Sequence, residues 1–97
     1  MEAEKEALLC GIMLGDGCLS FYRSKEGSTR YDISITMHLR DDLELAILSQ
    51  KLLGELSDRV VRIKKRPEYT AAIVQTYSKS AFNYMKKGWG FPVGTKK

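Results

Sequence analysis

Apolar residues recur at spacings of three and four in two stretches of the chain, which predicts two amphipathic helices. The first covers residues 2–15 and the second residues 42–55, with Asp41 or Asp42 as its cap. A shorter helix is expected over residues 78–87. The apolar positions that set the spacing are Leu8, Leu9, Ile12 and Met13 in the first helix, and Leu43, Ala46, Ile47, Leu48, Leu52 and Leu53 in the second.

Four strands are predicted, over residues 18–25, 31–39, 59–66 and 69–76. Apolar and polar residues alternate in the second and third of them, and the fourth is nearly all apolar or small. In the second strand, one face holds Ile33, Ile35 and Met37, and the other holds Asp32, Ser34, Thr36 and His38. The order helix–strand–strand–helix–strand–strand–helix predicts one α+β domain over residues 1–97. Its four-stranded antiparallel sheet carries helices on one face and leaves the other face open.

Small residues lie along one side of the first predicted helix, because Ala3, Ala7, Gly11 and Gly15 recur every four positions. Such a stripe lets two helix backbones approach closely. A chain of 97 residues has a small core, so pairing with a second copy would add apolar burial. The predicted dimer interface is Ala7, Leu8, Gly11, Ile12 and Gly15. Gly17 is expected to end the helix as a left-handed cap.

Composition and charge narrow the class of protein. Hydrophobic residues make up 43% and charged residues 29%, which is typical of a globular domain. The net charge is +4, and residues 59–66 hold five bases and no acid, which favours a nucleic-acid partner. Cys10 and Cys18 are too few for a disulfide framework. With no signal peptide or membrane span in the sequence, a cytoplasmic or organellar protein is expected.

The open face of the predicted sheet carries the candidate DNA-binding residues. A two-stranded ribbon fits the major groove, where such side chains contact base edges or phosphates. Arg62 and Arg66 are suited to pair with guanine. Lys64 is equally suited to contact a base or a phosphate. A solvated outer face is the alternative, although three cations on one strand repel each other unless a polyanion covers them. The candidates are Ser20, Tyr22, Ser24, Ser34, Thr36, His38, Arg62, Lys64 and Arg66.

Asp16 is a candidate metal ligand at the end of the first helix. A carboxylate there faces the negative end of the helix dipole, and two copies would converge if the helices pair about a two-fold axis. A divalent cation such as Mg²⁺ removes that cost, because it takes carboxylate and carbonyl oxygens as ligands. The alternative is that Asp16-Gly17 is only a turn after a helix.

The run Leu-Cys-Gly-Ile-Met-Leu-Gly-Asp-Gly at residues 9–17 resembles the motif of the LAGLIDADG homing endonucleases. Both inner glycines, the final aspartate and the last glycine match, and Leu14 stands where the motif has its first aspartate. The tail at residues 90–97 also resembles a segment that follows the third helix in many members. With the order of elements, the resemblance covers nearly the whole chain.

The resemblance implies a homodimer whose sheet lies in the major groove of double-stranded DNA. It implies that Asp16 binds Mg²⁺ at the scissile phosphates, with the Gly15 carbonyl as support. It also implies that Asp41 positions the attacking water and that Lys96 or Lys97 stabilises the phosphate. The expected reaction is hydrolysis of one phosphodiester per strand in a pseudopalindromic site. Intron or intein association is expected, with neither a membrane nor a small-molecule substrate.

Two other functions remain open. Family members usually continue with further helices, and none follows Lys97, which favours a non-cleaving DNA-binding regulator on the same scaffold. The weaker alternative is a dimerisation module in which the small-residue stripe matters and the sheet does not.

Overall fold

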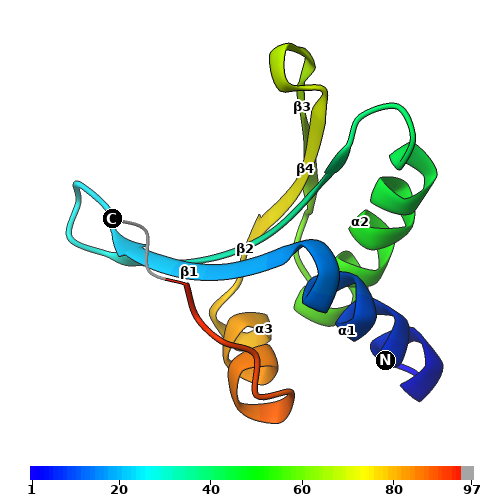
Figure 1. Ribbon diagram of the computed structural model, residues 1–97. Helices are drawn as coiled ribbons and strands as arrows, with labels where there is room; N and C mark the ends of the chain where they lie inside the picture. Colours follow the sequence, from blue (N-terminus) through cyan, green and yellow to red (C-terminus); the bar gives the residue numbers. More distant parts are fainter. Residues whose placement is uncertain (95–97) are drawn as a thin grey trace.

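The computed structural model describes residues 1–94, in which the helices cover one face of a four-stranded sheet (Figure 1). The elements are α1 (Ala3–Asp16), β1 (Gly17–Arg23), β2 (Thr29–His38), α2 (Leu43–Ser57), β3 (Arg62–Arg66), the 3₁₀ turn η1 (Pro67–Tyr69), β4 (Ala71–Tyr77), α3 (Lys79–Asn83) and the π-helical turn η2 (Tyr84–Gly88). The predicted α+β class, element order and one-sided helical layer are confirmed.

The sheet has the strand order β1-β2-β4-β3, and every neighbouring pair is antiparallel. The chain makes one hairpin from β1 and β2, crosses over through α2, and makes a second hairpin from β3 and β4. The two hairpins meet where Ile35 of β2 lies opposite Val74 of β4. The second strand of each hairpin is therefore central, and the first strand of each lies at an edge.

The core fills the space between the sheet and the helices. Ile33 and Ile35 of β2 and Val74 of β4 are fully buried there, as the alternation in β2 predicts. Leu9 and Met13 of α1 pack into the same cluster from the other side. Each such side chain contributes about 1.5–3 kcal/mol by leaving water, so this cluster holds the helical layer on the sheet.

All the elements have boundaries that differ from those predicted, and β3 and the third helix differ most. β3 begins at Arg62 and not at residue 59, because Asp58 adopts a left-handed conformation (φ 53°) after α2. The main chain before β3 is paired with side chains: the Gln50 amide donates to the Val61 carbonyl at 2.8 Å. The third predicted helix consists of the five residues of α3 followed by η2.

Gly17 lies where α1 passes directly into β1, and its predicted left-handed conformation is wrong. Its φ is −89° and its ψ 160°, so the chain is already extended. A Cβ at this position would lie 2.7 Å from the Met13 Cα and 2.6 Å from the Met13 Sδ. Glycine is therefore required here by the close approach of β1 to α1, and not by its backbone freedom.

Gly17→Ala is expected to lower the free energy of unfolding by about 1–3 kcal/mol, because the new methyl group meets the backbone of Met13. Gly54→Ala is the matched control, since a Cβ there makes only ordinary contacts at 3.7 Å or more within α2. That control should raise stability by about 0.5–1 kcal/mol. Urea unfolding of both variants measures the two effects, and equal stabilities would contradict the steric explanation.

Candidate nucleic-acid interface

The face of the sheet away from the helices brings the predicted polar positions of several strands together. Residues directly opposite in an antiparallel ladder point to the same side. One row across the sheet is Arg62, Gln75 and Ser34. The next rows are Lys64, Ile73 and Thr36, and then Arg66, Ala71 and His38. The six predicted residues from β2 and β3 therefore share one face, which we call the open face.

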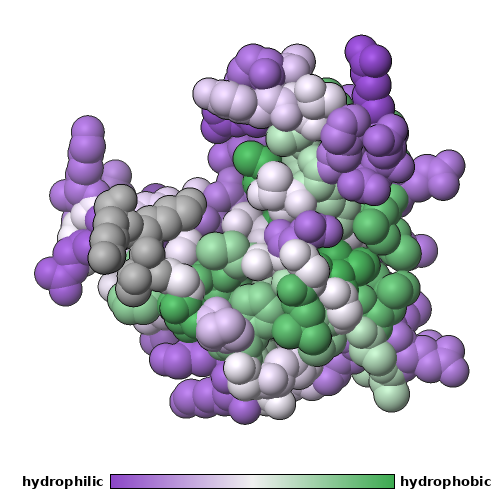
Figure 2. Space-filling view, in the orientation of Figure 1, coloured by the Kyte–Doolittle hydropathy of each residue, from purple (hydrophilic) through white to green (hydrophobic). Residues whose placement is uncertain are grey.

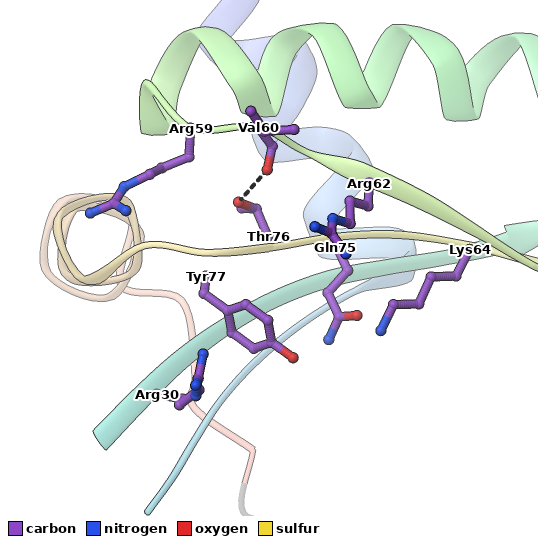
Figure 3. A pocket seen from close by; sticks show the side chains of 8 residues that line it. All are labelled: Arg30, Arg59, Val60, Arg62, Lys64, Gln75, Thr76 and Tyr77. Atoms are coloured by element: carbon purple, nitrogen blue, oxygen red, sulfur yellow. Dashed lines mark hydrogen bonds between the residues drawn. The ribbon is translucent and has the colours of Figure 1, made fainter. Parts of the chain in front are cut away.

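Positive charge on the open face has little to balance it. Neither of the two ion pairs within residues 1–94 involves a cation of β3. A hollow of about 560 Å³ lies beside β3 and β4, and its lining contains four cations and no acid (Figure 3). These cations are Arg30, Arg59, Arg62 and Lys64. Such an arrangement attracts a polyanion whose phosphates relieve the repulsion between the cations.

Sequence reasoning missed three residues of the open face. Gln75 and Tyr77 of β4 and Arg30 of β2 line the hollow, and the guanidinium of Arg30 lies 5.6 Å from the centre of the Tyr77 ring. The Tyr77 hydroxyl is hydrogen-bonded to that of Tyr22 at 3.3 Å across β2. Alternation within β4 could have identified Gln75 and Tyr77, because they share one face of the strand and the buried Val74 lies on the other.

Two of the three DNA-binding residues predicted on the first strand are not exposed on the open face of β1. Ser20 is only 3% exposed, and its hydroxyl makes a long hydrogen bond of 3.4 Å to Asp32, so neighbouring side chains cover it. Ser24 lies beyond β1 in the hairpin turn, where its hydroxyl bonds Ser28 at 3.0 Å. Tyr22 is therefore the one predicted DNA-binding residue of this strand that lies on β1 and is exposed.

Asp41 lies in the loop after β2. Gly17, which follows Asp16, is paired with Ile35 in the sheet, whereas Asp41 lies beyond the end of β2. Its carboxylate is 3.6 Å from the His38 Nδ1, which also accepts from the Asp41 N–H at 3.2 Å. His38 therefore shapes this loop, and the predicted role of Asp41 in positioning water stays a prediction.

Asp16 is the last residue of α1 and is exposed. The helix ends there, which leaves the carbonyl of Gly15 without an intrahelical N–H partner. These oxygens are of the kind that Mg²⁺ and similar cations bind. No group of three or more carboxylate, histidine or cysteine side chains able to hold a metal occurs within residues 1–94. One copy of the chain thus offers part of a ligand set.

The exposed side of α1 contains the predicted small-residue stripe. Nothing lies within 4 Å of a Cβ built at Gly11 or Gly15, so both positions are open to a partner. Leu8 is exposed beside them, and so is Leu14, 70% exposed, which the predicted interface did not include. Ile12 is only 9% exposed and belongs to the core of its own chain, so it lies beneath this surface.

Hydrophobic residues surround the exposed side of α1. Figure 2 shows apolar surface on the part of the molecule where Figure 1 places α1 and α2, and hydrophilic surface toward the outer ends of both hairpins. On α2, Leu43, Ile47 and Leu48 are exposed. Exposed apolar surface of this kind is typical of an interaction site.

The segment after η2 returns to the start of β1. Val93 forms a parallel bridge with Leu19, and the Gly94 N–H donates to the Leu19 carbonyl at 2.8 Å. The described chain therefore ends beside Leu19 of β1, close in the sequence to Asp16 at the end of α1. Lys96 and Lys97, the predicted phosphate-stabilising lysines, lie outside the described residues.

Glu6 anchors the same C-terminal region to α1. Its carboxylate accepts from the Tyr84 hydroxyl at 2.7 Å and from the Trp89 indole N–H at 3.1 Å. These hydrogen bonds, the one from Tyr84 first, hold the pKa of Glu6 below its usual value and raise the pKa of Tyr84. Because the charged form of Glu6 is stabilised in the folded state, this contribution to stability is lost as the pH falls through that lowered pKa.

None of the helices in the described part of the chain has the length and apolar character that crossing a bilayer requires.

The fold is similar to that of the homing endonuclease I-DmoI. A structure of mesophilic variants of that enzyme has a TM-score of 0.69 and 26% identity over 89% of this chain. The structure of I-DmoI with DNA and Mn has a TM-score of 0.65 and 25% identity over 89% of this chain. The chain spans about half the length of these proteins, 49% of each. No family model and no curated protein matches the sequence.

The structural similarity and the sequence motif both point to the homing endonucleases. The match to I-DmoI covers 89% of this chain, and α1 ends at Asp16, within the Gly-Asp-Gly run that carries the sequence resemblance. In its fold, and in the motif that ends α1, the chain is similar to the LAGLIDADG homing endonucleases.

Proposed function

We propose that this chain is a homodimeric, Mg²⁺-dependent endonuclease that binds a pseudopalindromic duplex on its open face and cuts both strands. It would act in a prokaryotic cytoplasm or an organelle, as the product of an intron or intein. The observation that supports it most is the cationic hollow on the open face of a sheet whose fold is that of I-DmoI, a protein solved on DNA. Edge-strand cations of β3 hold phosphates, and the centre of the sheet faces the bases.

Pairing through α1 supplies the second half of the assembly. The chain spans about half the length of I-DmoI, and nothing within 4 Å of a Cβ at Gly11 or Gly15 covers these positions, which supports the approach of a second α1 there. A two-fold axis there makes the interface the same on both copies, and it brings two Asp16 carboxylates together. It also imposes the two-fold symmetry expected of the DNA site.

The two copies of Asp16, with the Gly15 carbonyls beside them, would hold the divalent cation. A bound Mg²⁺ supplies charge neutralisation at the phosphate and lowers the pKa of water. A water oxygen would then form a bond to phosphorus as one phosphodiester P–O bond breaks in each strand; the water would lose a proton to solvent, and the leaving oxygen would take one up. Asp41 as the residue that positions this water, and Lys96 as a cation at the phosphate, remain predictions.

Incubation of the protein with a randomised duplex library, in Mg²⁺ and in EDTA, tests this function. Selective enrichment in both conditions with cuts only in Mg²⁺ is the expected result. Selective enrichment without any cut would assign the chain to non-cleaving regulators on the same scaffold. An absence of selectivity would leave only a dimerisation module.

Arg62→Ala combined with Lys64→Ala is expected to flatten the dependence of DNA binding on salt. Each lost phosphate contact lowers the slope of log K against log salt by about one. The control pair Lys86→Ala and Lys87→Ala removes the same charge from η2 in the helical layer, and it should leave the slope near that of the unsubstituted protein. Titrations of DNA with each variant at several salt concentrations measure both slopes. If the Arg62 and Lys64 variant had the slope of the unsubstituted protein, β3 would not contact phosphate.

A further inference from the structure

One acidic residue lies within the cationic open face, and it is buried. Asp32 is on the central strand β2, is only 3% exposed, and faces the same side as Ser34 and Thr36. A carboxylate on a DNA-binding surface weakens binding to phosphate, so Asp32 does not contribute to the affinity for DNA and must have another role. Its two oxygens contact different neighbours, which shows what it does.

The carboxylate of Asp32 holds the side chain of Gln75. The Gln75 Nε2 donates to the Asp32 Oδ1 at 2.9 Å, and the Ser20 hydroxyl donates to the Oδ2 at 3.4 Å. A carboxylate only accepts hydrogen bonds, so the carbonyl end of the amide is excluded from this position. The Gln75 amide therefore has one orientation, with its Oε1 and its second N–H left for another partner.

Gln75 lies in the middle of the open face. It is half-buried on β4, between Arg62 of β3 and Ser34 of β2 in one row of the sheet. Figure 3 shows its side chain among those of Lys64, Arg62 and Tyr77, on the side of the sheet away from α2. The flanking cations suit phosphates, while a short amide on a central strand suits the edge of a base.

We propose that Gln75 is a specificity-determining residue that selects adenine, and that Asp32 is the positioning residue that makes it selective. This inference rests on the DNA-binding function proposed above. Adenine presents an N6 donor and an N7 acceptor in the major groove, which match the Oε1 and the second N–H of the held amide. Guanine presents two acceptors, O6 and N7, one of which would face the Oε1 and find no proton.

Base preference at each position of the selected site tests the inference. The unsubstituted protein should prefer adenine over guanine by about tenfold at one position in each half-site, as expected for a good bidentate contact. Gln75→Ala should remove that preference. Asp32→Asn should reduce it to about twofold or less, because an asparagine both donates and accepts and so lets the Gln75 amide turn over.

Glu55→Gln is the control for loss of a carboxylate, since Glu55 lies on α2 and pairs with Lys5. It should leave every base preference unchanged. Thermal unfolding checks that Asp32→Asn folds, and Gln75→Ala, which alters a half-buried side chain, tests the same contact independently.

The inference is supported when both variants lose preference at the same base pair. It is overturned when both keep the preferences of the unsubstituted protein, or lose them at different positions. An unsubstituted protein that selects no sequence would overturn the DNA-binding function itself, which is a different result from selective binding unaffected by these variants.

Discussion

Asp16→Asn is expected to reduce metal-dependent DNA cleavage by at least about 100-fold while leaving duplex binding intact. Loss of groups that only support metal ligands costs about 10–100-fold, and a direct ligand contributes more. The neutral amide of asparagine cannot offset the charge of the cation, so the phosphate loses its electrostatic partner. Binding should hold, since Asp16 is an exposed side chain at the end of α1 and the cations of β3 are unchanged. Cleavage in Mg²⁺ and binding in EDTA are measured on the same duplex.

Asp58→Asn is the matched control, because Asp58 is also an exposed aspartate at the end of a helix, α2. Its left-handed conformation, φ 53°, suits asparagine as well. Cleavage by this control should equal that of the unsubstituted protein. If Asp16→Asn cut DNA as fast as the unsubstituted protein, Asp16 would not be the metal ligand, although the protein would still be a nuclease.

Gly11→Leu is expected to convert the proposed dimer to a monomer of 11.0 kDa. Overpacking of a close contact costs about 1–3 kcal/mol, and a two-fold interface contains the substitution twice. The dissociation constant should therefore rise by at least about 30-fold. The monomer itself should fold normally, because nothing within 4 Å opposes a side chain at Gly11. Analytical ultracentrifugation over a range of concentrations measures the change.

Lys86→Leu adds the same exposed leucine to η2 and should leave the dimer unchanged, which separates a steric effect from general stickiness. A Gly11→Leu protein with the dimerisation constant of the unsubstituted chain would place the interface away from α1. The exposed apolar residues of α2, among them Ile47, would then be the next surface to examine.

Some features of the interface were predictable from local pattern because each depends on residues close in the chain. Alternation with a period of two assigned Thr36 and His38 to one face of β2, and Arg62 and Lys64 to one face of β3. The ladders then aligned these faces, as any antiparallel sheet requires. The same reasoning applied to β4 would have found Gln75.

Burial within the open face was not predictable in this way. Period-two alternation assigns Ser20 and Asp32 to the same face as Tyr22 and Thr36, yet the first two are 3% exposed. Their burial depends on which strands lie side by side. Gln75 reaches Asp32 because β4 crosses over to pair with β2, and that pairing joins residues 43 positions apart.

The sequence by itself determined the order of the elements, the small-residue stripe on α1 and the motif that contains Asp16. Periodicity, helix-ending residues and motif spacing are properties of neighbouring residues. Only the tertiary structure decided why Gly17 must be glycine, which side chain Asp32 holds, and that Gly94 returns to β1. Each of these depends on the strand order and on packing between distant segments, which alternation along the chain does not encode.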